Sequence, residues 1–194
     1  MKILVVTPRF GSDIVGAAEE YARTAATLLA QTHAVEVATT TALNALRPAH
    51  YPSGVSEEGG IRIHRFGLLR DGGHGAEPSS LGLLSFLHGE GRRYDAILFY
   101  DHQAPSTVLG LPIVPERAAL IPMAVGGVPD ERPFRALFQM PRALGFVSPE
   151  ERARINAELH VEHIPYELLI TRADDATMSE FTKPLEDLVA LTVV

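Results

Sequence analysis

The chain has 194 residues, 46% hydrophobic and 21% charged, which is typical of one well-buried globular domain. Its formal charge of −7 argues against nucleic acid as a partner, because a surface that follows phosphates normally carries a basic excess. The absence of cysteine excludes disulfides, thiolate nucleophiles and cysteine-ligated metals.

Two further classes are disfavoured by pattern. The eight histidines show no zinc-type spacing, so we expect no metal site. No apolar run approaches the length of a membrane span, and we expect a cytoplasmic protein without one.

The chain opens with a predicted strand, loop, helix and strand. Residues 2–8 form an apolar run with almost no alternation, as in a parallel strand buried on both faces. A loop with Gly11 and Gly16 then opens a helix over 17–30, a geometry that aims backbone N–H groups at an anion. The next strand is predicted over 35–41.

Strand and helix signals then alternate along the chain. Further strands are predicted over 61–66, 96–100, 118–123, 144–147 and 163–169. Further helices are predicted over 80–90, 105–110, 131–139 and 149–159. The alternating residues of 61–66 indicate an edge or half-exposed strand, and the stretches 42–60 and 71–80 are predicted as loops. We therefore predict an α/β fold, a three-layer sandwich with a mostly parallel sheet of about six or seven strands.

The last residues differ from the rest. From Thr171 the sequence is polar and linker-like, after which Phe181, Leu185, Leu188 and Val189 follow near helical spacing. Either a helix that packs on the sheet or a frayed end fits this pattern. We accordingly divide the chain into a domain over 1–170 and a linker with a short helix or tail over 171–194.

Seven motifs occur in order along the chain: Pro8–Gly11, Gly16–Glu19, Tyr51-Pro52, Gly60–Phe66, Tyr94–Tyr100, Leu109–Pro112 and Pro141–Arg152. This ordered set resembles the N-terminal half of family 4 glycosyltransferases, which are two-domain enzymes of the GT-B architecture.

The resemblance implies a Rossmann-like, acceptor-binding domain of a retaining enzyme. Such an enzyme transfers a sugar from a nucleotide-sugar donor to a sugar or lipid-linked acceptor, without a metal or other cofactor. It also implies a separate or missing C-terminal donor-binding domain, without which we expect no activity. The alternative is a stand-alone, non-catalytic binding or scaffold domain derived from such an enzyme, and a homodimer is left open.

The resemblance assigns the glycines of the first loop to the donor. Gly11 and Gly16 would let the backbone approach the diphosphate. Ala17 stands where the family commonly has a second glycine, and its methyl group argues against close donor contact. The alternative is a tight turn between strand and helix.

Asp101 and His102 follow the strand predicted over 96–100, and open α/β sheets bind ligands at the carboxyl ends of their strands. The resemblance makes His102 the candidate catalytic contact to the sugar, with Asp101 as its orienting partner or as an acceptor for a hydroxyl. The alternative is a helix-capping Asp beside a surface His.

Three further residues are candidates for binding the acceptor. Asp13 would accept a hydrogen bond from a hydroxyl, or is a turn residue that bonds its own backbone. Gly126 and Gly127 follow the fifth predicted strand and would form an anion-accepting nest, or belong to a plain loop. In the family this position frequently holds a histidine, which this chain lacks.

Overall fold

The computed structural model describes residues 1–43, 50–69, 78–124, 132–169 and 178–193. The strands are β1 (Lys2–Val6), β2 (Ala34–Thr40), β3 (Gly54–Glu58), β4 (Ile61–Phe66), β5 (Ala96–Tyr100), β6 (Ala118–Ile121), β7 (Ala143–Phe146) and β8 (Tyr166–Leu168). The helices are α1 (Ala17–Leu29), α2 (Leu81–Glu90), α3 (Pro105–Gly110), α4 (Arg132–Phe138), α5 (Pro149–Leu159) and α6 (Met178–Thr192). Single 3₁₀ turns are η1 (Gly91–Arg93), η2 (Leu111–Ile113) and η3 (Pro115–Arg117).

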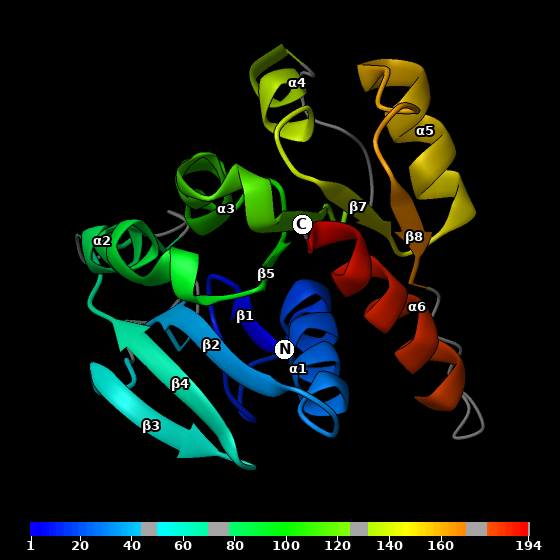
Figure 1. Ribbon diagram of the computed structural model, residues 1–194. Coiled ribbons are helices and arrows are strands. Elements are labelled where there is room, and N and C mark those ends of the chain that lie inside the picture. The colour runs from blue at the N-terminus through cyan, green and yellow to red at the C-terminus, as the bar shows by residue number, and fades with distance from the viewer. Residues whose placement is uncertain (44–49, 70–77, 125–131, 170–177, 194) are drawn as a thin grey trace.

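These strands form one sheet in the order β3-β4-β2-β1-β5-β6-β7-β8. Every neighbouring pair is parallel except β3 and β4. Helices α1 and α6 pack on one face of the sheet, and α2 to α5 pack on the other (Figure 1). The predicted three-layer α/β fold with a mostly parallel sheet is thereby confirmed.

Two expectations about the sheet were wrong. The predicted loop over 42–60 contains β3, which pairs antiparallel with β4 and brings the sheet to eight strands. Strand β4 is therefore an inner strand and not an edge strand. It is half-exposed, the other form predicted for it, since Arg62 is exposed and His64 and Phe66 are partly buried. Gly59 and Gly60 join the two strands with φ values of 58° and 80°, the positive angles that a tight two-residue hairpin turn requires.

Helix α6 belongs to the same core as β1 and α1. Phe181, Leu185, Leu188 and Val189 are buried there, so of the two interpretations of the tail the packed helix is correct. A β-carbon on Gly145 of β7 would lie 2.9 Å from Leu188 Cδ2, which means that the bare glycine lets α6 approach the sheet. The domain division after residue 170 stays a prediction.

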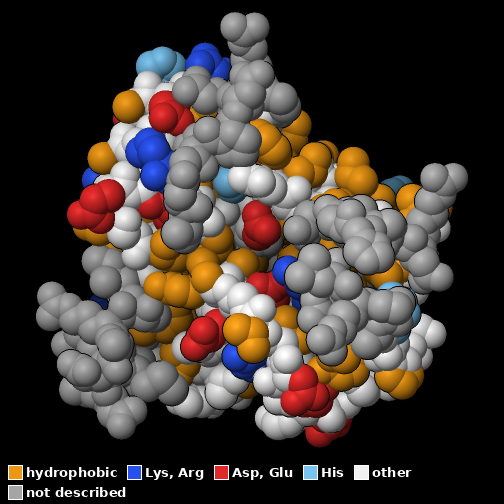
Figure 2. Space-filling view, turned by 180° about the vertical axis from the view of Figure 1, so that it is seen from behind, with side chains coloured by type: hydrophobic (Ala, Val, Ile, Leu, Met, Phe, Trp, Pro, Cys, Tyr) orange, Lys and Arg blue, Asp and Glu red, His pale blue; other side chains and the backbone are white. Residues whose placement is uncertain are grey.

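Charge and hydropathy of the surface are mixed. Seen from behind, acidic and basic side chains lie side by side near the middle of the molecule, with hydrophobic ones around them (Figure 2). Within the described residues, no helix has the length and hydropathy needed to cross a membrane.

Candidate functional site

The chain order of the strands reverses between β1 and β5. From β1 the chain continues to β2 on one side, whereas β5 pairs with the other side in the register Val6 to Phe99. The loop after β1 and the residues Asp101 and His102 after β5 therefore leave the sheet side by side. In open α/β sheets the ligand crevice lies at such a reversal, outside the carboxyl ends of the strands.

The loop after β1 is fixed by side chains from other elements. A β-carbon on Gly11 would lie 2.3 Å from the hydroxyl oxygen of Tyr51, so the glycine makes room for that ring. The guanidinium of Arg65 stacks 4.4 Å from the centroid of the Tyr51 ring and donates to the Phe10 carbonyl at 3.2 Å. Arg23 donates to the Gly11 carbonyl at 2.9 Å. The loop is thus held rigidly against β4 and α1.

Gly16 leaves space for the Glu19 carboxylate at the start of α1. A β-carbon there would lie 2.2 Å from Glu19 Oε2, and Glu19 is itself buried. Arg9 Nε and Nη2 both lie 2.7 Å from Glu19 Oε1. A negative charge in the first turn also suits the positive end of the helix. The N-terminus of α1 therefore already has an anion of the protein's own, beside the exposed Ala17.

This arrangement gives Gly11 and Gly16 a packing role that sequence reasoning did not anticipate. Their assignment, with Ala17, to a donor phosphate stays a prediction. An incoming phosphate at this helix end would meet the Glu19 carboxylate, whose ion-pair partner among the described residues is Arg9.

Asp101 adopts a left-handed backbone conformation, with φ of 67°. Such angles are uncommon outside glycine and occur often at functional sites. The half-buried carboxylate accepts a hydrogen bond from the Gln103 N–H at 3.0 Å. Burial raises the pKa of Asp101, and the charges of Glu19 and Arg9 also act on it in opposite directions. Because β5 pairs with β1, the backbone of Asp101 leaves the sheet beside the β1 loop.

His102 is buried, and its ring is oriented by the backbone of the neighbouring strand. Nδ1 lies 2.9 Å from the Pro122 carbonyl, which only accepts, so Nδ1 carries the proton. Burial lowers the pKa of His102, which keeps the ring neutral. The expected orienting role of Asp101 was wrong, since Pro122 fills it. Asp101 remains a candidate hydroxyl acceptor.

The other ring nitrogen of His102 is unsatisfied. Nε2 is buried and has no hydrogen-bond partner in the described part of the chain. The ring packs against Phe134 and Phe138 of α4, with centroids 5.2 Å and 5.4 Å away. A neutral histidine with its proton fixed on Nδ1 presents a lone pair at Nε2, which is an acceptor for a hydroxyl that reaches it.

Two residues of α5 hold the end of β6, and sequence reasoning missed both. Buried Glu151 accepts the Ala124 N–H at 2.6 Å and the Val147 N–H at 2.7 Å, and Arg154 donates to the Ala124 carbonyl. Burial raises the pKa of Glu151. The Ser148 cap identifies the start of α5, but a local pattern does not reveal a contact to a loop 27 residues away.

The candidate acceptor-binding residues are only partly placed. Asp13 is exposed in the loop after β1, close enough to Tyr51 that its charge adds to burial in raising the pKa of that phenol. Gly126 and Gly127 lie outside the described residues. The structure thus brings Asp101 beside the β1 loop, whereas the His102 ring packs against α4. No group of three metal-binding side chains gathers among the described residues.

Fold and site together define an open α/β domain with a crevice at the reversal between β1 and β5. The sequence matches no known family model and no curated protein. Among solved structures the fold is similar to sucrose-phosphate synthase from Thermosynechococcus elongatus, with a TM-score of 0.58 and 14% identity. That match covers 89% of this chain and 48% of the synthase, so the chain spans about half of that enzyme.

A shorter chain of the same enzyme is similar as well. Its TM-score is 0.57 at 13% identity, and the match covers 97% of this chain and 99% of that one. These likenesses establish a glycosyltransferase-like fold that corresponds to half of a GT-B architecture.

Proposed function

We propose that this chain is the acceptor-binding domain of a retaining, family 4-like glycosyltransferase. The observation that carries the proposal is the pair Asp101 and His102 at the reversal between β1 and β5. The left-handed backbone of Asp101, and the buried Nε2 of His102 without a partner among the described residues, are features that a purely structural strand end does not need. The likeness to half of a two-domain enzyme supports the same assignment.

In this proposal each residue has a defined task. The half-buried Asp101 carboxylate accepts a hydrogen bond from a hydroxyl of the acceptor. His102 Nε2 accepts a second one from a hydroxyl that reaches the ring beside Phe134 and Phe138 of α4. The sugar comes from a nucleotide-sugar donor held by a second domain, without a metal. Arg9, the one basic side chain in the sequence between β1 and α1, is paired with Glu19 and is therefore not offered to the donor.

The same pairing favours a second candidate function. If the Glu19 carboxylate keeps phosphates away from the N-terminus of α1, the domain binds a hydroxylated ligand without taking part in transfer. The chain is then a non-catalytic binding domain derived from such an enzyme.

A binding measurement tests what the two candidates share. Isothermal titration with methyl glycosides of common hexoses should show weak, saturable binding to the wild-type chain and loss of binding in Asp101→Asn. Gln103→Ala, which removes only a neighbouring exposed side chain, is the matched control and should bind normally. Equal binding by wild type and Asp101→Asn would contradict the proposal.

A transfer assay then separates the two candidates from each other. We expect no turnover of any common sugar nucleotide by the chain alone. If a donor-binding domain is supplied in trans, turnover identifies the transferase, and its absence favours the binding domain.

A further inference from the structure

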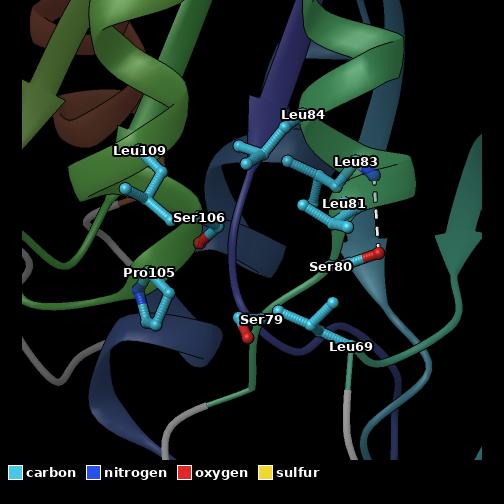
Figure 3. A pocket seen from close by; sticks show the side chains of 9 residues that line it. All are labelled: Leu69, Ser79, Ser80, Leu81, Leu83, Leu84, Pro105, Ser106 and Leu109. Atoms are coloured by element: carbon cyan, nitrogen blue, oxygen red, sulfur yellow. Dashed lines mark hydrogen bonds between the residues drawn. The ribbon is translucent and has the colours of Figure 1, made fainter.

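A small pocket lies between the first turns of α2 and α3. Side chains of α3 line one side, those of α2 line the other, and Leu69 and Ser79 lie near the pocket's end (Figure 3). Its volume of about 50 Å³ accommodates only a few water-sized groups. Leu69, Leu81 and Leu109 at the pocket are 55%, 59% and 52% exposed, which is unusual for leucine.

The two described segments that form most of the pocket lining carry no charge. Residues 78–89 and 102–115 contain no Asp, Glu, Lys or Arg, although 21% of the chain is charged. The two segments pack against each other through α2 and α3. Two uncharged segments with exposed leucines fit a hydrocarbon occupant, since neither segment offers a counter-charge to a charged ligand.

One polar atom at the pocket lacks a partner. Ser106 is 4% exposed, and its Oγ makes no hydrogen bond within the described residues. Ser80, by contrast, is satisfied, because its Oγ donates to the Gly67 carbonyl at 2.6 Å and caps α2 at Leu83. A buried, unpaired hydroxyl is costly, which points to an oxygen of a ligand as its partner.

The pocket and the candidate site are joined along the chain by the start of α3. The Ala104 N–H donates to the Asp101 carbonyl at 3.3 Å, and Thr107 Oγ1 donates to the Tyr100 carbonyl at 3.1 Å. Ser106 therefore lies on the turn that follows Asp101 directly. A ligand with its head group at Asp101 would extend past Ser106 toward the leucines.

We propose that this pocket binds the alkyl or acyl chain of an amphipathic acceptor whose hydroxylated head group lies at Asp101. The head-group placement rests on the proposed function, whereas the chain-binding pocket rests on the leucines, the uncharged segments 78–89 and 102–115, and Ser106. The first carbons fill the pocket, and the rest of the chain lies along Leu81 and Leu109. Ser106 Oγ donates to the oxygen that joins chain and head group.

Paired ligands test this directly. Hexyl and methyl β-D-glucopyranoside share a head group and differ only in alkyl length, and both are used below micelle-forming concentrations. Each methylene that enters the pocket should tighten binding about fourfold, so the hexyl glucoside should bind at least about tenfold more tightly. Leucine methyl and backbone amide NMR signals report the two halves of the site separately.

Substitutions at the leucines test whether the tighter binding of the hexyl glucoside comes from this surface. Leu81→Asn and Leu109→Asn change side chains that are more than half exposed, so the fold should persist while hexyl binding falls to the methyl level. Val55→Thr, on the exposed face of β3, is the matched control and should bind hexyl glucoside like wild type. Thermal melting of each variant verifies that it is folded.

The outcomes separate the two proposals. Shifts at both the leucine methyls and the Asp101 amide support the whole assignment. Leucine shifts with a silent Asp101 amide support the chain pocket and overturn the proposed function. Equal affinities with silent leucines overturn the pocket and leave the proposed function intact. If the leucine variants instead convert a dimer to a monomer and hexyl glucoside has no effect, the surface joins two copies and the pocket proposal is wrong.

Discussion

Two buried polar groups on nearby strands have opposite environments. Glu36 on β2 has Lys2 Nζ at 3.0 Å, His64 Nε2 at 2.7 Å and the Tyr94 hydroxyl at 2.9 Å. His102 after β5 has a partner on one nitrogen and none on the other among the described residues. A polar group with a structural role makes its hydrogen bonds within the protein, whereas a ligand-binding group keeps an unpaired atom for the ligand. This contrast, rather than burial alone, separates the structural cluster from the candidate site.

The largest expected effect on stability is at Glu36, whose hydrogen bonds are satisfied within the protein. Glu36→Ala should lower the free energy of unfolding by about 3 kcal/mol, because it leaves Lys2, His64 and Tyr94 without their shared acceptor. Urea denaturation measures the loss. Glu57→Ala, on the exposed strand β3, is the matched control and should change stability by less than about 0.5 kcal/mol. Equal effects of the two substitutions would contradict a structural role for Glu36.

The pH dependence of stability should have the same origin. Burial alone would raise the pKa of Glu36, but hydrogen bonds from His64, Lys2 and Tyr94 outweigh it and lower the pKa to about 2, from an unfolded value of 4.5. The stabilisation is therefore fully present above pH 4.5 and is lost as the pH falls toward 2. Denaturation midpoints of wild type and Glu36→Gln should differ at pH 6 and converge in acid. A gap that stays constant would refute this account.

An intermediate effect is expected at the first loop. In Gly16→Ala the new methyl group would occupy the place of the Glu19 carboxylate, 2.2 Å from Oε2, and must displace it from Arg9. We expect a loss of about 1–2 kcal/mol. Gly67→Ala is the control, since nothing lies within 4 Å of a β-carbon there. If Gly16→Ala leaves stability unchanged, the glycine serves something other than Glu19, such as a phosphate.

The smallest effect on stability is expected at His102. His102→Phe removes the unpaired Nε2 along with the bond to Pro122, so stability should change by less than about 1 kcal/mol. Glycoside binding should nevertheless be lost. A large destabilisation with unchanged binding would reverse the assignment, because it would make His102 a structural residue.

Sequence patterns located elements well where the signal is local. The predicted helices over 105–110 and 149–159 coincide with α3 and α5, and in α5 the Ser148 side chain caps the helix at Glu151 as its sequence indicates. Strand β3 was missed because Gly54, Val55, Ser56 and Glu57 are all exposed, which leaves no hydrophobic pattern. Gly59-Gly60 was the available signal, since two glycines between strands favour a hairpin.

The candidate site was predictable in position but not in detail. The end of a buried strand identified Asp101 and His102, because sheet topology alone brings such residues to one edge. The partner of His102 is a carbonyl 20 residues away, and the anchors Arg9, Glu19 and Glu151 act through tertiary contacts. From sequence alone, a charged residue in the first turn of a helix is expected to be solvated. Only the structure shows the distant partner that buries it.

The central claim is that the unsatisfied edge after β5, and not the satisfied cluster at Glu36, meets a ligand. Amide NMR shifts during titration with methyl glycosides and sugar phosphates test it most directly. The account predicts perturbations at residues 101–106 and 11–18, with the amides of Glu36, His64 and Tyr94 unchanged. Shifts that leave 101–106 silent and gather elsewhere would contradict it.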